Sequence, residues 1–280
     1  MDTELVNHLR PTLKSYAYNI CGSVEDAEDV VQDVLIKFLD VEQQQIENVK
    51  AYLIRMVINR SIDQKKKLRK QVLNYPGEWL PEPVAAERAD AGINRKELLS
   101  YSLMVLLEKL NPRQRAVFIL KEAFDYEHTE IATVLDIKPD LSRQLLTRAR
   151  KSIGDPAELR GNTIPDSFLS KYLNVLQSGD MQQLEALLNE DIVSISDGGG
   201  KARAAVKPVF GRKSVAALLL GLYRKFNEQA LVQQGWVNGQ PALLYFSAGK
   251  LIKCVTFTFN EGRISQAYII RNPDKLKNLN

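Results

Sequence analysis

The stretch that decides the fold is Glu25–Lys70, which contains an acidic segment, EDAEDVVQDVLIKFLD (25–40), and a basic segment, KAYLIRMVINRSIDQKKKLRK (50–70). In both segments apolar residues recur at steps of three and four, as they do along one face of a helix. The recurring residues are Ala27, Val30, Val31, Val34, Leu35 and Phe38 in the first segment, and Ile54, Val57, Ile58 and Ile62 in the second. We therefore expect two consecutive helices, each with one buried face.

The outer faces of these two helices carry opposite charge. Asp26, Asp29 and Asp33 lie on the first, with the apolar Ile36 exposed beside them, which suits a basic protein partner. The second presents Arg55, Asn59, Asp63, Lys66 and Lys70, extended by Lys65, Lys67 and Arg69. Clustered Lys and Arg bind phosphate by releasing counterions. A single charged run is usually a solvated helix face, but two opposed runs suit a protein on one side and nucleic acid on the other.

Three short motifs in this stretch carry a family resemblance. DAEDVVQD (26–33), AYL (51–53) and NRSID (59–63) together resemble region two of bacterial extracytoplasmic-function sigma factors. The resemblance implies that the acidic helix docks on the clamp of core RNA polymerase, and that the basic helix with its leading loop opens and reads the minus-ten element. It implies polymerase binding by Asp29, Asp33 and Ile36, and DNA binding by Asn59, Asp63, Lys65, Lys66, Lys67, Arg69 and Lys70.

The composition of the whole chain fits an ordinary globular protein. Its 280 residues favour two domains, and its net charge of +4 is small enough that a nucleic-acid site must depend on local clusters. Cys21 and Cys254 match no metal spacing, which indicates a reduced, cytosolic protein and no cofactor. There is no run of eighteen apolar residues, and the acidic N-terminus is unlike a signal peptide. We expect a cytoplasmic protein with no membrane partner.

Residues 74–96 break the helical pattern and contain the segment WLPEP (79–83). Its two prolines hold the chain extended. Trp79 and Leu80 are too apolar to remain in water, because full burial of such a side chain is worth about 2 to 3 kcal/mol. Two interpretations stay open, a hydrophobic plug against its own domain and a regulatory docking site. Both predict that the segment is buried.

Residues 97–157 contain a pattern typical of a helix-turn-helix. The segment EIATVLDIKP (130–139) predicts a short helix, a tight turn at Asp136, and a second helix that runs from Pro139 to Ile153. In that second helix we expect Leu141, Leu145 and Ala149 to face the core and Arg143, Gln144, Thr147 and Lys151 to face outward, with Arg148 and Arg150 at the borders. Arg and Gln are the side chains that read guanine and adenine edges.

This second pattern resembles region four of the same sigma family, through EIA (130–132) and RAR (148–150). The resemblance implies recognition of the minus-thirty-five element by Arg143, Gln144, Thr147, Arg148 and Lys151. Asp136 stands where the family usually has Gly, but Asp tolerates a left-handed backbone better than most residues, so we expect the turn to be kept.

The remaining residues, 162–280, predict an α+β domain. Helices are expected at 165–177, from the N-cap Asp180, and at 212–226, and strands at 192–196, 230–237, 242–248, 251–259 and 263–270. Asn-Gly and Glu-Gly turns predict that the later strands form consecutive antiparallel hairpins. The pattern resembles the SnoaL-like cone fold of polyketide cyclases and ketosteroid isomerase, which implies a pocket that an unidentified small ligand could occupy.

Catalysis in this domain would need groups that transfer protons. The domain has no histidine, and Asp197 is the one acid placed where chemistry could occur. The three glycines that follow Asp197 indicate a turn whose backbone approaches another group closely. We therefore favour a structural or docking role for Asp197 over a catalytic one. The alternative is a DNA-binding protein fused to an active cyclase or isomerase.

Three separated motifs, WLPEP (79–83), DGGGK (197–201) and NPDKL (272–276), resemble the signature of one sigma subgroup, whose members carry a fused SnoaL-like domain. The resemblance implies a non-enzymatic, multidomain sigma factor whose own C-terminal domain modulates its activity. Two all-α domains, region two at 1–73 and region four at 97–157, are expected around the linker 74–96, followed by the α+β domain at 162–280. The expected regulatory contacts are Trp79, Leu80, Pro81, Glu82, Pro83, Asp197, Gly198, Gly199, Gly200, Lys201, Asn272, Pro273, Asp274, Lys275 and Leu276.

Overall fold

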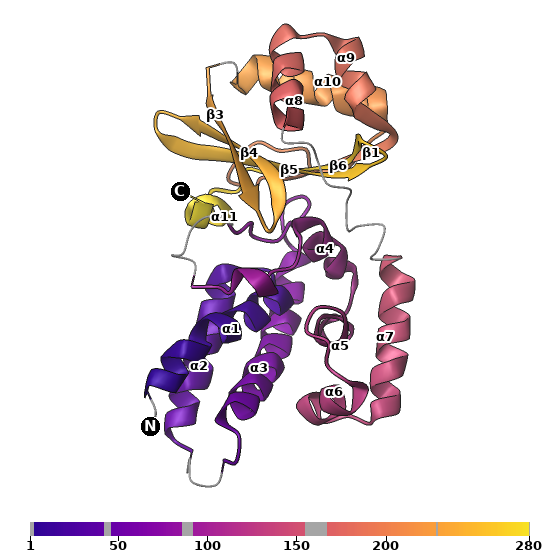
Figure 1. Ribbon diagram of the computed structural model, residues 1–280. Helices are drawn as coiled ribbons and strands as arrows, with labels where there is room; N and C mark the ends of the chain where they lie inside the picture. Colours follow the sequence, from indigo (N-terminus) through magenta and orange to yellow (C-terminus); the bar gives the residue numbers. More distant parts are fainter. Residues whose placement is uncertain (1–2, 42–45, 86–91, 155–166, 228, 280) are drawn as a thin grey trace. The chain divides into compact units, whose positions relative to one another are not determined.

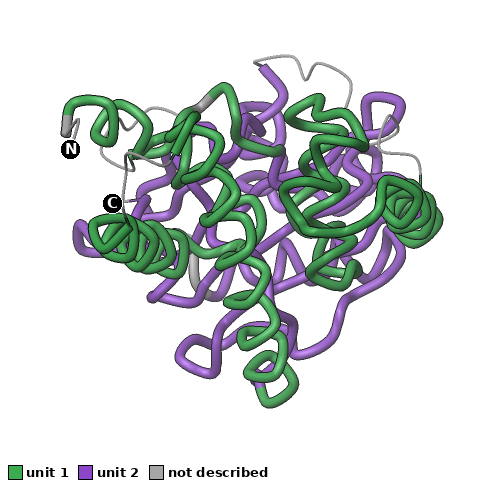
Figure 2. The backbone as a smooth tube through the Cα atoms, turned by 90° about the horizontal axis from the view of Figure 1, so that it is seen from below, with its two compact units in different colours: residues 1–74, 88–99, 103–156 green, residues 75–87, 100–102, 157–280 purple. Residues whose placement is uncertain are grey.

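The computed structural model describes residues 3–41, 46–85, 92–154, 167–227 and 229–279. The chain forms two compact units (Figure 2). Unit 1 consists of Met1–Asn74, Arg88–Leu99 and Leu103–Pro156, and unit 2 of Tyr75–Glu87, Ser100–Ser102 and Ala157–Asn280. The segment WLPEP thus belongs to the same unit as the C-terminal domain.

Unit 1 begins with three long helices, α1 (Thr3–Cys21), α2 (Val24–Leu39) and α3 (Val49–Val72) (Figure 1). Helix α2 starts at Ser23, whose side chain accepts a hydrogen bond from the Asp26 backbone N–H, as expected of an N-cap. The expected apolar faces of α2 and α3 are buried, apart from Leu35, which is partly exposed. The apolar spacing therefore predicted both helices and the faces that they bury.

The second half of unit 1 is a set of short helices. They are η3 (Arg95–Glu97), α4 (Tyr101–Leu106), η4 (Leu107–Lys109), α5 (Pro112–Glu122), α6 (His128–Leu135) and α7 (Pro139–Ile153), of which α4 begins with residues of unit 2. Asn111 caps α5 in a reciprocal pair with Gln114. Asp136 ends α6 with a left-handed φ of 52°, so the expected helix-turn-helix turn is present.

One prediction for helix α7 is wrong. Leu141, expected in the core, is 37% exposed, whereas Ser142 and Leu146 are buried beside the expected Leu145 and Ala149. The buried face is therefore rotated by one residue at the start of the helix. Ser142 can replace Leu141 inside because its hydroxyl makes a 2.8 Å hydrogen bond with His128 Nδ1, which satisfies a buried polar group.

Unit 2 is a mixed sheet with helices α8, α9 and α10 on one face and the short helix α11 on the other side (Figure 1). Its helices are α8 (Ser167–Ser178), α9 (Met181–Leu187), α10 (Arg212–Leu222), the π-helical turn η6 (Tyr223–Asn227), α11 (Pro273–Leu276) and η7 (Lys277–Leu279). Its strands are β1 (Leu188–Asp197), β2 (Val209–Phe210), β3 (Leu231–Val237), β4 (Gln240–Ser247), β5 (Lys250–Asn260) and β6 (Arg263–Ile270), in the order β2-β1-β6-β5-β4-β3.

The expected α+β class of this domain is confirmed, but its sheet is not wholly antiparallel as predicted. Strands β3 to β6 form consecutive antiparallel hairpins, whereas β1 pairs with β6 in parallel. The turns explain the hairpins, because Asn238-Gly239 and Glu261-Gly262 all have positive φ. No local turn joins β1 to β6, so the sequence pattern did not indicate whether these two strands pair in parallel or antiparallel.

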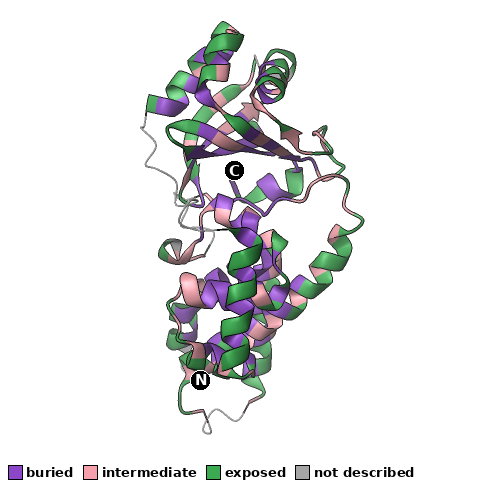
Figure 3. Cartoon of the chain, turned by 90° about the vertical axis from the view of Figure 1, so that its right-hand side faces the viewer, coloured by how far each residue is buried: buried purple, intermediate pink, exposed green. Residues whose placement is uncertain are grey.

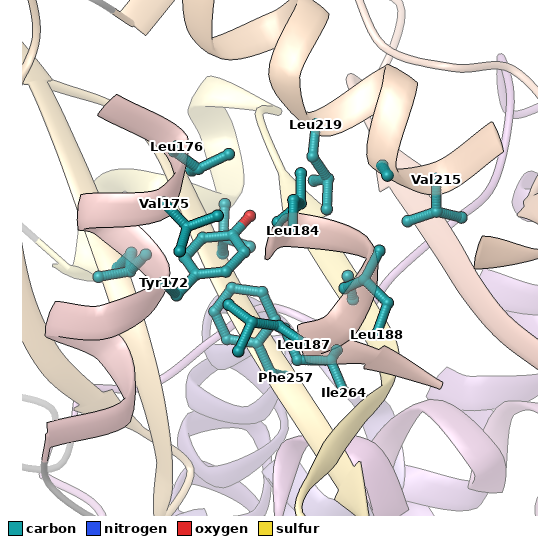
Figure 4. Close-up of a cluster of buried hydrophobic side chains, with 14 of the residues drawn as sticks. Tyr172, Val175, Leu176, Leu184, Leu187, Leu188, Val215, Leu219, Phe257 and Ile264 are labelled. Atoms are coloured by element: carbon teal, nitrogen blue, oxygen red, sulfur yellow. The ribbon is translucent and has the colours of Figure 1, made fainter. Parts of the chain in front are cut away.

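The core of unit 2 lies between the sheet and helices α8, α9 and α10. Figure 4 shows Tyr172 and Leu176, with Leu184 and Leu219, gathered around Phe257 of β5. Figure 3 shows that the buried residues of this unit are concentrated along the sheet and that the exposed residues lie on the outer sides of the helices. The side chains on this face of the sheet form a tightly packed apolar layer.

Candidate functional site

Asp197, at the end of β1, is fully buried and joins the three motifs that the sequence singled out. Its Oδ1 accepts a hydrogen bond from the Tyr75 hydroxyl at 2.6 Å. Its Oδ2 accepts from the Leu80 backbone N–H at 2.9 Å and pairs with the Lys275 ammonium at 2.6 Å. Lys275 also donates to the Leu80 carbonyl. We call these four residues, with Asn272, the Asp197 cluster.

The geometry of the Asp197 cluster makes it costly to disturb. Removing one partner of a buried ion pair typically costs about 3 to 5 kcal/mol, because the other charge is left buried. Tyr75 shares in the network, since its hydroxyl accepts from Asn272 Nδ2 at 2.9 Å while donating to Asp197. Burial and the adjacent Asp197 carboxylate raise the pKa of Tyr75 well above its usual range, so Tyr75 stays a donor.

Two glycines of the DGGGK motif are required by close approaches. A Cβ on Gly198 would lie 2.1 Å from the Ala202 carbonyl oxygen. A Cβ on Gly199, whose φ is +60°, would lie 2.2 Å from Asn272 Nδ2. The glycines therefore allow the loop to pack against the NPDKL motif, as the sequence suggested, and the two motifs are also joined by an exposed ion pair between Lys201 and Asp274.

The WLPEP segment is held along its whole length within unit 2. Leu80 is 1% exposed, and Pro81, Glu82 and Pro83 are also buried. Asn278 donates to the Glu82 carboxylate, and the Lys275 ammonium lies 4.1 Å from the centre of the Trp79 ring. The expected burial is confirmed for Leu80, whereas Trp79 is only partly buried.

The chain after WLPEP continues as an addition to the edge of the sheet. The Val84 N–H donates to Asn238 Oδ1 and the Val84 carbonyl accepts from the Asn238 N–H, both at 2.9 Å. Ala85 forms an antiparallel bridge with Val237 at the end of the edge strand β3. Backbone pairing of this kind fixes the register of the segment as well as its position.

The first turn of α4 belongs to the same unit. The Tyr101 hydroxyl donates to the Pro81 carbonyl at 2.7 Å, and its ring meets Tyr268 of β6 edge-on with the centroids 5.6 Å apart. The Ser102 N–H donates to Gln240 Oε1 at 2.8 Å. The sequence analysis missed Tyr75, Tyr101 and Gln240, because a single polar residue outside a motif gives no signal of a distant partner.

On α2, the residues expected to bind polymerase differ in accessibility. Asp29 is exposed, and Ile36 is 61% exposed. Asp33 is partly buried, and its carboxylate pairs with Arg60 of α3 at 2.6 Å. Leu39, which the sequence analysis did not single out, is also exposed on this helix. The face thus offers the apolar side chains of Ile36 and Leu39 next to the exposed Asp29 and the ion-paired Asp33.

On α3, the residues expected to bind DNA fall into two groups. Lys67 and Lys70 are exposed, and Lys66 is exposed and paired with Asp63 at 2.7 Å. Asn59, Lys65 and Arg69 instead contact the second half of unit 1. Asn59 Nδ2 donates to the Val134 carbonyl at 2.8 Å, Arg69 donates to the Leu110 carbonyl at 3.1 Å, and the Lys65 ammonium pairs with Glu108 at 2.8 Å. Lys65 is 3% exposed, so in this conformation it is closed to phosphate.

On α7, all the residues expected to bind DNA are exposed, namely Arg143, Gln144, Thr147, Arg148 and Lys151. The Arg143 guanidinium pairs with the Asp140 carboxylate one turn earlier at 2.8 Å. Because this ion pair is exposed, hydrogen bonds from Arg143 to a base edge could replace it. Arg150 at the border pairs with Glu122 of α5. These are residue types with which recognition helices contact bases and phosphates in a major groove.

The described residues hold no group of His, Cys, Asp and Glu side chains that could bind a metal ion. Among the same residues, no helix is long and apolar enough to cross a membrane. Both oxygens of Asp197 are occupied by donors from the protein itself.

Comparison with known proteins places these features in one family. Residues 5–71 match the model of sigma-70 region 2, and residues 100–153 match that of sigma-70 region 4. The chain is 30% identical to the ECF RNA polymerase sigma factor SigJ of Mycobacterium tuberculosis, over 98% of this chain and 93% of the relative. It is 26% identical to the probable ECF sigma factor SigI of the same species, over 95% and 92% of the two chains.

The fold agrees with the sequence comparison over the whole length. The crystal structure of the Mycobacterium tuberculosis extracytoplasmic function sigma factor SigJ superposes with a TM-score of 0.79 at 28% identity and covers 99% of both chains. The match thus includes the C-terminal α+β domain as well as the two helical regions. This chain belongs to the extracytoplasmic-function RNA polymerase sigma factors.

Proposed function

We propose that this protein directs core RNA polymerase to specific promoters and that its own C-terminal domain modulates its activity through the docked linker. Family membership supports the first part. The observation that carries the second part is the Asp197 cluster, in which one buried carboxylate binds Tyr75 and Leu80 of the linker and Lys275 of the NPDKL motif.

The roles of the separate faces follow from their chemistry. Asp29, Asp33 and Ile36 of α2 form the surface for core polymerase, an apolar patch beside carboxylates. The basic α3 and the exposed stripe of α7 bind promoter DNA. On α7, Arg143 and Gln144 read base edges, whereas Lys151 holds phosphate.

Control by the C-terminal domain acts through the position of the linker. The two DNA-binding regions must reach two separated promoter elements, and the segment that connects them in the chain is the one held by the Asp197 cluster. If the C-terminal domain binds the linker more tightly in one arrangement of the two DNA-binding regions than in another, it shifts the population toward the arrangement that it binds more tightly.

A catalytic C-terminal domain is the weaker alternative. Asp197 is the acid that chemistry would need, and Tyr75, Leu80 and Lys275 already use its two oxygens. An acid or base must be within hydrogen-bond reach of a substrate, whereas Asp197 is fully buried and its two oxygens already accept three hydrogen bonds from the protein. The occupied carboxylate supports a domain that acts by binding and not by catalysis.

A charge reversal on α2 tests the polymerase contact. Asp29→Lys places a cation on the exposed acidic face and should abolish pull-down of core RNA polymerase by the full-length protein, with the circular dichroism spectrum unchanged. Asp191→Lys is the matched control, since Asp191 is also exposed but lies on β1 of the C-terminal domain. Equal retention of core polymerase by both variants would refute the assignment.

A further inference from the structure

Lys253 of β5 lies on the face of the sheet that carries the apolar core of unit 2. Its cross-strand neighbour on β4 is Tyr245, and the pair two positions along, Leu243 with Val255, belongs to that core. Because side chains alternate along a strand, Lys253 shares the face of Val255. Lys253 is 6% exposed. The apolar layer therefore ends on an amine that is nearly, but not completely, closed to solvent.

The surroundings of this amine add positive charge and no carboxylate. The Lys253 nitrogen lies 3.4 Å from the centre of the Tyr245 ring, and no ion pair to Lys253 occurs in the part of the chain that the structure describes. The register of β5 and β6 brings Arg271, the first residue after β6, beside Lys253, and its charge acts on the lysine. Like charges on neighbouring strands are destabilising, so the pair is costly to keep unless it has a use.

The weak acids near Lys253 stay protonated at neutral pH. Burial raises the pKa of Tyr245 well above its usual range, and the nearby Tyr223 of η6 adds to this effect. Burial also raises the pKa of the adjacent Cys254 thiol, to about 12. With both groups uncharged, burial of the ammonium and the charge of Arg271 lower the pKa of Lys253 to about 7.

A neutral amine in an apolar site is a nucleophile, and lysines that form Schiff bases are activated by desolvation or by an adjacent cation. Lys253 has both features. We propose that Lys253 is a reactive lysine of the C-terminal domain that captures a small aldehyde or ketone as a Schiff base. Its nitrogen attacks the carbonyl carbon, a C=N bond replaces the C=O bond, and the carbonyl oxygen leaves as water with the two hydrogens of the amine. The step needs no oxidant or reductant.

The position of Lys253 selects a small, uncharged carbonyl compound. The neighbouring Leu243 and Val255 are buried and apolar, and Arg271 disfavours a second cation. The unprotonated Schiff base is neutral, so capture removes the need to bury an ammonium beside a guanidinium, which favours the adduct. This capture is independent of the proposed binding of polymerase and promoter DNA.

Reductive alkylation of the full-length protein tests the capture. Propanal and sodium cyanoborohydride at pH 7 fix each Schiff base as a propyl-lysine, and peptide mass spectrometry then compares Lys253 with Lys250, an exposed lysine of the same strand. We expect Lys253 to be alkylated at least about fivefold faster than Lys250, although it is the more buried of the two. A buried lysine without this reactivity reacts more slowly than an exposed one. Equal or slower alkylation of Lys253 would therefore overturn the proposal.

Three controls tie the fast reaction to the folded site. The ratio of the Lys253 rate to the Lys250 rate should fall from pH 7 to pH 9, because ordinary lysines gain neutral amine over that range while Lys253 is already largely neutral. Urea that unfolds the protein should abolish the difference between the two rates. Lys253→Met should lose the fast-reacting site, whereas Lys250→Met should keep it. Fast alkylation that persists in the unfolded chain or in Lys253→Met would show that the reactive amine lies elsewhere.

Discussion

At the scale of single residues, the C-terminal domain contains a buried lysine, Lys253, that has no carboxylate partner among the described residues. Lys253 of β5 is 6% exposed and shares the inner face of the sheet with its cross-strand neighbour Tyr245. Its ammonium lies 3.4 Å from the centre of the Tyr245 ring, and no ion pair to Lys253 occurs among the described residues. Burial, together with the nearby charge of Arg271, lowers the pKa of Lys253 to about 7.

This lysine makes stability depend on pH. Between about pH 7 and the unfolded value near 10.5, the unfolded chain binds a proton that the folded chain lacks, so the free energy of unfolding should rise with pH across that window. Lys253→Met should remove this rise and stabilise the protein at pH 7 by about 1 to 3 kcal/mol, because the contact with Tyr245 offsets only part of the desolvation. Urea unfolding at pH 7 and pH 9 measures both effects. If Lys253→Met changed the free energy of unfolding by the same amount at pH 7 and pH 9, this explanation would be wrong.

Base reading is also decided by single side chains. Arg143→Ala should weaken binding of holoenzyme to its cognate upstream element by about 1 to 3 kcal/mol and relax selectivity there. Lys67→Ala should weaken binding to all sequences alike and reduce the salt slope by about 1. Binding titrations on cognate and scrambled upstream elements at several salt concentrations separate the two. The same loss on both elements from Arg143→Ala would show that this residue does not read bases.

At the scale of elements, the helix-turn-helix depends on a turn in which Asp136 adopts a strained, left-handed backbone conformation. Asp136 has a φ of 52°, in the region that glycine adopts most easily. Asp136→Gly should therefore leave the free energy of unfolding unchanged or raise it by up to about 1 kcal/mol, despite the added flexibility of the unfolded chain. Asp136→Val, which cannot adopt this conformation cheaply, should destabilise the protein. Thermal unfolding of the two variants gives the order, and a more stable Asp136→Val would contradict the argument.

The sequence predicted elements better than it predicted contacts. Helical spacing placed α2 and α3, and turn chemistry placed the hairpins of β3 to β6, because both signals are local. The parallel pairing of β1 with β6 was missed, since it joins distant segments without a turn. Lys65 was expected to face DNA on the same helical spacing, but its neighbour Glu108 lies in another helix, and spacing along one helix says nothing about what packs against it.

For the regulatory motifs, the resemblance predicted which residues matter but not how they meet. Asp197, Leu80 and Lys275 were all expected to be contacts, and the structure brings them together around one carboxylate. Tyr75 lies just before the linker motif and gave no signal, although it is the third ligand of that carboxylate. The individual contributions of these residues to control stay predictions.

At the scale of the whole molecule, helix α4 contains residues of both units. Its first turn, at Tyr101 and Ser102, is held by Pro81 and Gln240 in unit 2, and its last turn leads directly into η4, which carries Glu108.

The most direct test of the account is run-off transcription by core polymerase with Lys275→Met, which removes the ion pair to Asp197 and the bond to the Leu80 carbonyl while keeping the length of the side chain. Lys171→Met is the matched control, because Lys171 is exposed on α8 and lies outside the three motifs. The account predicts that Lys275→Met changes transcription from a cognate promoter severalfold and that Lys171→Met leaves it near the wild-type level. Equal transcription by all three proteins, with the linker of Lys275→Met shown by limited proteolysis to be released, would contradict it.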